Sequence, residues 1–392
     1  MDVAALRKET PGCKKVVHLN SAGASLMPEP VIAAQIDYLR LESEIGGYEA
    51  KAEQLPRIEA VYDSIARLVN ADRDEIALQE NATVAWIAAF NAVPFQAGDR
   101  VVTGEAEYAS NYLNFLRAKE RLGIEILVAP SDVSGQIDVD ALEALLDERV
   151  RLIAITHIPT NGGLVNPAAD IGRLARKHGI LYLLDACQSA GQLHLDVEAL
   201  GCDLLSVTGR KYLRGPRGTG FLYVRKAALA QLTPLNLDLL AAHWVAPDRY
   251  ELLPTARRFE NWEFNFAAVL GLGAAVDYAL ALGTEAIEAR VQWLARRLRF
   301  ILSDYAKLEV HDIGETKSGL VTFSVPDRTA SEVQRDLRAR NINVSVSDPG
   351  STLLDASRRK LPDLIRASVH YFNTEEDDFQ ALTAALWETR RK

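Results

Sequence analysis

Cysteine is scarce in this chain of 392 residues. The three cysteines, Cys13, Cys187 and Cys202, are odd in number and lack the spacing of metal ligands. This pattern argues against a disulfide framework, gives no reason to expect a metal site, and favours a reducing compartment.

Membrane segments, a secretion signal and an excess of basic charge are also missing. No apolar run approaches the roughly 18 residues that a membrane-spanning helix needs. Residues 1–15 (MDVAALRKETPGCKK) lack the apolar core and cleavage site of a signal peptide. The net charge is −9, which speaks against nucleic acid as the main partner. We therefore expect a soluble, cytoplasmic protein that binds neither membranes nor nucleic acid.

Short apolar runs alternate with helical patterns over most of the chain. Between several of them, apolar residues recur every three to four positions, as in 109–123 and 167–179. This alternation predicts an α/β fold with a mostly parallel sheet between helices. The runs expected as strands are RVVTGE (100–105), EILVAP (125–130), RLIAITH (151–157), LYLLDA (181–186), DLLSVT (203–208) and GFLYV (220–224).

The length and a change of pattern predict two domains. A chain of 392 residues is too long for one typical core. Near residue 265 the alternation gives way to a long helical stretch, four short strand-like runs and a last helix. We expect a large cofactor-binding domain (16–265), a smaller α+β domain (266–392), and an N-terminal arm (1–15) that packs on the second domain.

Polar residues follow the predicted strands where open parallel sheets bind ligands. Asp185 ends one run and Lys211 follows the next, 26 positions later (211 − 185). Alone, the aspartate reads as a cap or an ion-pair partner and the lysine as a solvated charge. Together they fit pyridoxal phosphate, in which a lysine forms the Schiff base and an aspartate keeps the pyridine nitrogen protonated.

Other residues are weaker candidates when taken singly. Asn81 is a plausible helix cap, so the backbone N–H groups of Ala82 and Thr83 could face a phosphate. Tyr108 could stack on a planar cofactor or be a core or interface tyrosine. Arg366 could bind a substrate carboxylate bidentately, or it could be an ordinary surface arginine.

Several segments, taken in order, resemble class V (fold type I) pyridoxal-phosphate enzymes. This group includes cysteine desulfurases, kynureninases and isopenicillin-N-epimerase-like proteins. The resemblance implies a seven-stranded, mostly parallel sheet, pyridoxal 5'-phosphate as cofactor, an amino-acid substrate, and a homodimer with its site at the subunit interface. The segments are HLNSAGASLMP (18–28), THIPTNGGLVNP (156–167), DACQSAG (185–191), LGCDLLSVTGRKYLRGPRGTGFLYVR (200–225) and RASVHYFNTEEDDFQAL (366–382).

The resemblance also implies a role for each matching residue. Lys211 and Asp185 take the roles given above, with Tyr108 as the stacking residue, and Gln188 bonds the phenolic oxygen of the cofactor. A segment lent by the neighbouring subunit has Glu263 where many relatives have a threonine, so Trp262 and Asn265 are substitutes to test. The expected phosphate ligands are Ala82, Thr83, Thr208 and Arg210, and the expected substrate contacts are Asn20, Ala22, Tyr48, Asn161 and Arg366.

One departure decides the expected reaction. Cysteine desulfurases need a loop cysteine upstream of the carboxylate-binding arginine, and residues 343–368 contain none. Cys187 and Cys202 read as small buried residues. The segments EIGGYEA (44–50) and GEAEYASN (104–111), and the Arg-Lys pair before the glycine-rich turn, look most like hercynylcysteine sulfoxide lyases of the ergothioneine pathway. We therefore expect a β-eliminating C–S lyase that releases pyruvate and ammonia.

Several alternatives stay open. The cofactor motif does not separate a lyase from an aminotransferase, an epimerase or a desulfurase- or desulfinase-like enzyme, because all share a Cα carbanion or its equivalent. A former enzyme kept as a binding protein is disfavoured by the intact set of Asp185, Gln188 and Lys211. A nucleotide P-loop fails, because the glycines follow the lysine. Arg214 and Arg217 have no assigned role.

Overall fold

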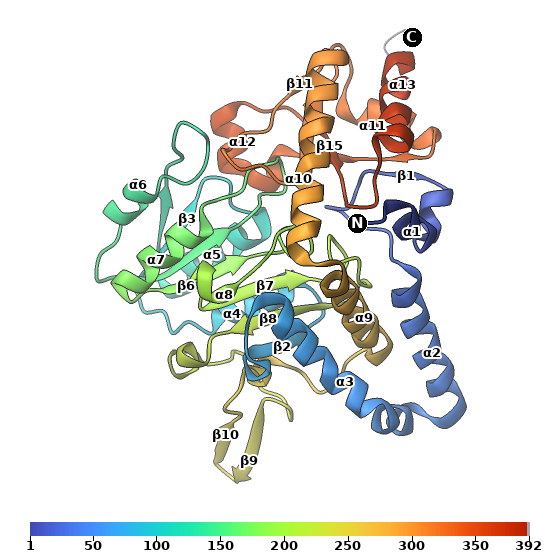
Figure 1. The fold of residues 1–392 in the computed structure, drawn as a ribbon. Coiled ribbons are helices and arrows are strands. Elements are labelled where there is room, and N and C mark those ends of the chain that lie inside the picture. The colour runs from blue at the N-terminus through green and yellow to red at the C-terminus, as the bar shows by residue number, and fades with distance from the viewer. Residues whose placement is uncertain (390–392) are drawn as a thin grey trace.

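A seven-stranded sheet lies at the centre of the computed structural model, which describes residues 1–389 (Figure 1). The strand order is β2-β8-β7-β6-β5-β3-β4, and only β8 runs against the others. The predicted α/β fold with a mostly parallel sheet is confirmed. The strands are β2 (Ile76–Gln79), β3 (Arg100–Gly104), β4 (Glu125–Ala129), β5 (Val150–Thr156), β6 (Leu181–Asp185), β7 (Leu204–Thr208) and β8 (Gly220–Val224).

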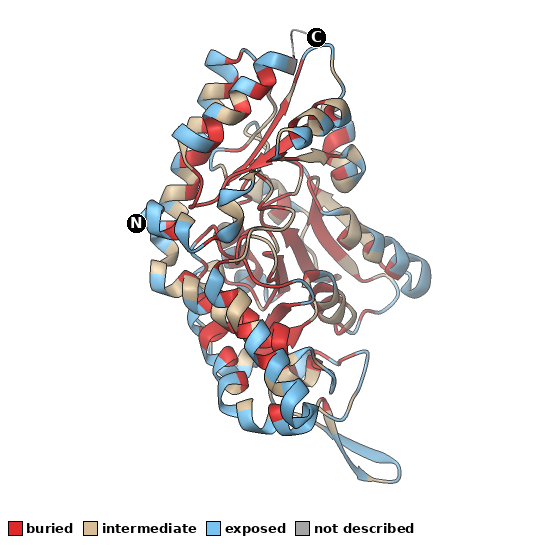
Figure 2. Ribbon diagram, turned by 90° about the vertical axis from the view of Figure 1, so that its right-hand side faces the viewer, coloured by how far each residue is buried: buried red, intermediate tan, exposed pale blue. Residues whose placement is uncertain are grey.

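The central strands are apolar throughout because both faces of the sheet are covered. Alternate residues of β6 enter two different cores: Leu181 and Leu183 pack on one face, and Tyr182 and Leu184 pack on the other. All five residues of β6, β7 and β8 are buried, and Figure 2 shows these strands as the inner layer. The first face is covered by helices α4 (Ala82–Asn91) and α5 (Ala109–Leu122), the second by α3 (Gly47–Val69), α7 (Ala168–His178) and α9 (Phe266–Leu282).

The C-terminal part of the chain forms a second, antiparallel sheet. Its strand order is β11-β12-β15-β14. Its strands are β11 (Glu309–Val310), β12 (Leu320–Ser324), β14 (Ser345–Ser347) and β15 (Leu364–Ser368). The helices of this part, beyond α9, are α10 (Thr284–Phe300), α11 (Ala330–Ala339), α12 (Leu353–Arg359) and α13 (Gln380–Thr389).

The remaining helices precede β7: α1 (Val3–Lys8), α2 (Glu29–Ile45), α6 (Val139–Ala144) and α8 (Val197–Leu200). Helices α2 and α3 pack against α9, which begins at the expected domain boundary. The boundary near residue 265 stays a prediction, and residues 390–392 of the expected second domain lie outside the described residues.

The N-terminal arm lies against the C-terminal part of the chain. Arg7 donates a hydrogen bond to Asp378 at 2.8 Å and another to the carbonyl of Phe372 at 3.1 Å. Strand β1 (Val17–His18) pairs in parallel with β13 (Ile342–Asn343). These contacts bring the segment that leads to Asn20 beside the second sheet.

Within residues 1–389, no single helix is long and apolar enough to span a membrane. Helices α9 and α10 pass the length and composition test only as a pair, and the chain bends by 81° between them.

A hairpin that the sequence did not predict extends from the body of the molecule (Figure 1). It consists of β9 (Ala242–Ala246) and β10 (Arg249–Leu252), and the side chain of Trp244 is 80% exposed. Neither strand has a buried face (Figure 2). The alternation that reveals a half-buried strand is therefore missing here.

Arg214, which had no role at the sequence level, joins three distant segments. Its guanidinium is buried and donates hydrogen bonds to the carbonyl of Leu26 (2.7 Å), the hydroxyl of Tyr371 (2.7 Å) and the hydroxyl of Thr10 (2.6 Å). It also lies 4.7 Å from the ring centre of Phe372. No carboxylate among the described residues forms an ion pair with it, so neutral acceptors and aromatic faces hold this charge.

Arg214→Met should destabilise the fold without touching the cleft. The substitution leaves three acceptors without their donor, and we expect the free energy of unfolding in urea to fall by about 3 kcal/mol. Arg217→Met, on the same loop but exposed, is the matched control and should change it by less than about 0.5 kcal/mol. An Arg214→Met protein as stable as the control would contradict the assignment.

Candidate active site

Two adjoining hollows at the carboxyl ends of β6 and β7 share Tyr108, Cys187 and Lys211. The wider cleft encloses about 520 Å³ and is bordered by the start of α4 and by the loop after β7. The narrower one, about 20 Å³, also reaches Thr160 and Asp185. The polar residues that follow the predicted strands therefore converge, as parallel strand ends in one sheet require.

Asp185 ends β6 with a carboxylate that is only 5% exposed. Its Oδ1 accepts a hydrogen bond from the backbone N–H of Cys187 and its Oδ2 accepts one from the side-chain amide of Asn111, both at 2.9 Å. Burial raises the pKa of Asp185, whereas these donors and the charge of Lys211 lower it. A desolvated carboxylate at the wall of a hollow favours a cationic partner there.

Lys211 follows β7 and lines both hollows. The thiol of Cys187 is its neighbour: burial raises the pKa of this thiol, and the charge and a hydrogen bond of Lys211 oppose the rise. Cys187 had been expected to be a small buried residue. Instead it is half-buried and borders the cleft, whereas Cys202 is buried as expected. The turn after β6 carries Cys187 to the cleft, a placement that composition alone does not reveal.

Gln188 carries an amide that is only partly satisfied. Its Nε2 donates to the carbonyl of Ala22 at 3.2 Å, and its buried Oε1 meets no hydrogen-bond partner in the described part of the chain. The N–H of Ala22 donates to the hydroxyl of Ser368 at 2.9 Å, and Asn20 forms a bridge with the same residue. The predicted contact Ala22 thus lies beside Gln188, and Asn20 lies on the same segment, which is tied to the second sheet.

The start of α4 and the loop after β7 border the wider cleft with hydrogen-bond donors of the kind that suit an anion. The side chain of Asn81 caps α4 by accepting from the N–H of Val84 at 3.0 Å. The N–H groups of Ala82 and Thr83 in the first turn therefore face the cleft without an intrahelical acceptor. Thr208, Arg210 and Arg217 also line this cleft, together with one acid, Glu80.

The two arginines differ in how they are held. The guanidinium of Arg210 donates to the carbonyl of Gly23, which ties it to the segment around Ala22. Arg217 is exposed and contacts no hydrogen-bond or ion-pair partner among residues 1–389. The sequence had left Arg217 without a role, and the structure places it beside the predicted phosphate ligands.

Tyr108 occupies the N-cap position of α5, makes no capping hydrogen bond with its side chain, and is 37% exposed at the cleft. Arg366, on β15, is buried and donates to the carbonyl (3.0 Å) and hydroxyl (2.7 Å) of Thr160, a residue of the narrower hollow. Its Nε is buried without a partner among the described residues. The second sheet thus brings a guanidinium to the edge of the hollow that contains Lys211.

Other predicted residues lie elsewhere in this chain. Tyr48, Trp262 and Asn265 line a separate surface pocket of about 500 Å³ between α2, α3 and the start of α9. The Asn265 side chain caps α9 by accepting from Ala268, and the ring of Trp262 lies 5.0 Å from the Lys51 ammonium. Within a single copy these residues do not meet Lys211.

Asn161 is engaged in holding the segment before Arg366. Its amide donates to the carbonyl of Asp348 (2.7 Å) and the hydroxyl of Thr352 (3.0 Å), and its oxygen accepts from Ser347 (2.5 Å). Both protons and the oxygen of its side-chain amide are therefore hydrogen-bonded within the chain itself. A contact between Asn161 and the substrate therefore stays a prediction, and these hydrogen bonds do not favour it.

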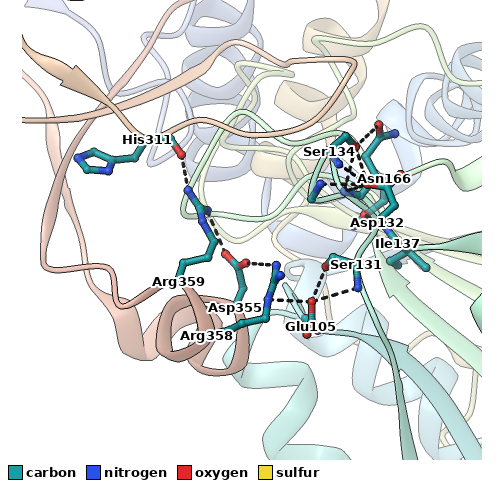
Figure 3. A network of polar contacts seen from close by, with 12 residues as sticks. Glu105, Ser131, Asp132, Ser134, Ile137, Asn166, His311, Asp355, Arg358 and Arg359 are labelled. Carbon is teal, nitrogen blue, oxygen red and sulfur yellow. Dashed lines mark hydrogen bonds and ion pairs between the residues drawn. The ribbon is translucent and has the colours of Figure 1, made fainter.

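A second set of polar contacts fixes helix α12 to the large sheet (Figure 3). Glu105, just after β3, accepts from the hydroxyl of Ser131 at 2.5 Å and pairs with Arg358 at 3.1 Å. The backbone N–H of Asp355 donates to the Glu105 carbonyl at 3.1 Å. Together with Asn161, these contacts hold residues 347–359 over the carboxyl end of β3.

Sequence reasoning missed Glu107 and Asn111. Glu107 is buried and accepts hydrogen bonds from Thr103 (2.9 Å), from the N–H (3.0 Å) and hydroxyl (2.5 Å) of Thr156, from the N–H of Tyr108 (3.0 Å) and from the Asn111 amide (2.8 Å). The available signal was the presence of two polar residues, four positions apart, on either side of a predicted helix start.

Comparison with known proteins identifies the family. The family model described as aminotransferase class V matches residues 17–380, so the chain belongs to the class V aminotransferase family. It is 30% identical to a probable cysteine desulfurase of Methanothermobacter thermautotrophicus over 95% of this chain and 94% of the relative. It is also 30% identical to a cysteine desulfurase of Yersinia pestis (strain Angola), over 96% and 94% respectively.

Solved structures confirm the fold. The apo structure of a cysteine desulfurase from Thermococcus onnurineus superposes with a TM-score of 0.90, at 25% identity, over 99% of this chain and 98% of that one. A structure of C-DES, at 22% identity and a TM-score of 0.87, covers 97% of this chain and 98% of that one and has glycine covalently linked to its pyridoxal-phosphate cofactor. The expected cofactor is therefore the one that structures of this fold carry.

The residues of the cleft fit pyridoxal phosphate. The positively charged nitrogen of a planar ring matches the desolvated carboxylate of Asp185. The buried Oε1 of Gln188 has no partner among the described residues and can accept a hydrogen bond from a further group. The N–H groups at the start of α4 and the arginines of the cleft suit a phosphate. Among residues 1–389, no cluster of acidic, histidine or cysteine side chains could hold a metal.

Glu107 should make the stability of the cofactor-free protein decrease as the pH rises. Burial raises its pKa from 4.5 to about 7, so between these values the folded chain binds a proton that the unfolded chain has lost. This part of the pH dependence is at most about 3 kcal/mol. Glu107→Gln cannot titrate and should flatten the curve of unfolding free energy between pH 4.5 and 7.5, measured in urea.

The remaining slope has an independent source. Glu260 accepts a hydrogen bond from the hydroxyl of Tyr62, and burial also raises its pKa to about 7. Glu260 is still present in Glu107→Gln and still titrates there. The curves of unfolding free energy against pH for the wild type and for Glu107→Gln should therefore converge at low pH and separate as the pH rises toward 7.5. Parallel curves over the whole range would contradict the role given to Glu107.

Proposed function

We propose that this protein is a pyridoxal-phosphate-dependent C–S lyase that works as a cytoplasmic homodimer. Its substrate would be an S-substituted cysteine or the corresponding sulfoxide, such as hercynylcysteine sulfoxide. β-Elimination at this substrate releases pyruvate and ammonia and expels the sulfur with its substituent.

One observation carries the choice of elimination over sulfur transfer to the enzyme. The segment that leads to Arg366 contains no cysteine, and Asn161 and Glu105 hold it in place. Of the three cysteines, Cys13 lies in the N-terminal turn and Cys202 is buried before β7. An elimination requires no thiol on the enzyme, so this inventory supports it.

The residues of the chain divide the work by position. Bound pyridoxal phosphate supplies an aldehyde that joins covalently to amines and a ring that withdraws electrons. The Lys211 amine, at the meeting point of both hollows, would take the proton from the substrate Cα. Asp185 would hold the positive charge of the ring nitrogen, and Arg366 would orient the substrate carboxylate toward Lys211.

A second candidate is a cysteine desulfurase that uses Cys187. The relatives at 30% identity bear that name, and Cys187 borders the cleft beside Lys211. This thiol lies between Asp185 and Gln188, two residues that would contact the cofactor ring. A bound ring would therefore cover the thiol, which is why we favour elimination.

A second copy of the chain would complete the site. Several large apolar side chains of α2 and α3 are exposed near the pocket that contains Trp262 and Asn265: Ile36, Leu39, Ile45, Tyr48 and Leu55. Their burial against an identical surface would be favourable. The pocket residues would then approach the cleft of the neighbouring copy, in line with the role first expected for Trp262 and Asn265.

The product distinguishes the two reactions. With S-substituted cysteine sulfoxides, the holoenzyme should release pyruvate and ammonia in equal amounts, measured by coupled dehydrogenase assays. Cys187→Ala should keep at least about half of this activity, because elimination needs no enzyme thiol. Lys211→Ala should lose at least about 1000-fold in kcat/KM. Release of alanine from cysteine, together with a persulfide on Cys187, would overturn the lyase in favour of the desulfurase.

Mixed dimers test the shared site. Lys211→Ala and the double variant Trp262→Ala/Asn265→Ala should each be impaired alone. In a statistical mixture, half of the dimers contain one native site, so pyruvate release should recover to about a quarter of the wild-type rate. A mixture no more active than its better component would show that Trp262 and Asn265 serve their own subunit or none.

A further inference from the structure

Two buried carboxylates share one side-chain amide beneath the cleft. The Nδ2 of Asn111 lies 2.8 Å from Oε1 of Glu107 and 2.9 Å from Oδ2 of Asp185, so each of its two protons goes to a different acid. All three side chains are more than nine-tenths buried. Such an arrangement fixes the amide, because a flip would direct its oxygen at both carboxylates.

Glu107 is held as an acceptor at every contact. Its five hydrogen bonds all come from donors: two hydroxyls, two backbone N–H groups and the Asn111 amide. Donors of this number stabilise the charged carboxylate and oppose the cost of its burial, which in the cofactor-free protein still raises the pKa of Glu107 to about 7. A cation held against Asp185 would lower this pKa again and leave Glu107 charged. Glu107 is therefore locked in one orientation by β3, β5 and the start of α5.

The charges at this end of the cleft do not balance. Glu107 and Asp185 supply two carboxylates, neither of which forms an ion pair within residues 1–389, and the charge of Lys211 lowers the pKa of Asp185. The Lys211 amine is also the group that the proposed reaction uses, so it is not a permanent counter-ion for both acids. Two buried acids without a cation are costly, so the pair favours a positive group placed against Asp185.

We infer that Glu107 is a positioning residue that acts through Asn111: it orients Asp185 and adds a second negative charge, which keeps the ring nitrogen of the bound cofactor protonated. The inference rests on the proposed cofactor but not on the choice between elimination and sulfur transfer. It also separates two functions within one loop, since Tyr108 faces the cleft while Glu107 faces the protein interior.

The protonation of the ring nitrogen can be measured directly. Wild-type protein and Glu107→Gln would be reconstituted with pyridoxal phosphate labelled with ¹⁵N in the ring, and the ¹⁵N chemical shift followed from pH 6 to 9. The wild type should keep the shift of a protonated nitrogen across this range. Glu107→Gln should titrate at a pH at least one unit lower than the wild type, a tenfold change in the protonation equilibrium.

Glu105→Gln is the matched control. Glu105 lies two positions earlier in the same loop, but it contacts Ser131 and Arg358 and has no link to Asp185 (Figure 3). Its ¹⁵N shift should follow the wild type. An equal change in both variants would assign the effect to the loop as a whole and would overturn the inference, as would a wild-type shift in Glu107→Gln.

Asn111→Ala covers the case in which Glu107→Gln fails to fold or to bind the cofactor. This variant removes the amide that joins Glu107 to Asp185 but leaves Glu107 with four of its five donors. The pH at which the ¹⁵N shift of the ring titrates should therefore also fall, by a smaller amount than in Glu107→Gln. A wild-type shift in Asn111→Ala would then overturn the inference. Wild-type protein that does not bind pyridoxal phosphate at all would instead refute the proposed function itself.

Discussion

The burial of the Asp185 carboxylate at the end of β6 is the constraint on which the site depends. A carboxylate taken out of water loses far more free energy than two hydrogen bonds return. The chain provides those two bonds, from Asn111 and from the turn that follows the strand, and it places Lys211 nearby. The desolvation cost of Asp185 is still not fully compensated, so a cationic ring bound at this end of the sheet would be favourable.

Sheet topology explains why these groups meet. Strands β5, β6 and β7 are parallel neighbours, so their carboxyl ends lie at one edge of the sheet. The crossovers through α7 and α8 are short, and they return the chain to the same starting edge each time. Asp185 and Lys211, which are separated by 26 positions in the sequence, therefore reach one cleft because β6 and β7, at whose carboxyl ends they lie, are paired side by side.

The features that could be predicted from the sequence are the buried strands and the functional residues at their ends. The apolar runs marked the strands because both faces of the sheet are covered, and the strand ends marked Asp185 and Lys211. Contacts made through a third residue were not predictable in this way. Glu107 reaches Asp185 only through Asn111, and Arg214 finds its partners in segments near both ends of the chain. The exposure of Cys187 was missed because it depends on a single turn.

The fixed segment before Arg366 bears on the chemistry as much as the missing cysteine does. A residue that accepts sulfur and passes it on must approach the substrate and then withdraw. Here residues 347–359 are tied by the Asn161 amide at one end and by Glu105 at the other. Every such contact would have to break for the segment to move. The structure therefore favours a fixed segment that forms a wall of the site over a mobile segment that carries sulfur. With such a wall, the sulfur group that leaves the substrate is not carried away by the enzyme and departs by diffusion, in agreement with the elimination proposed above.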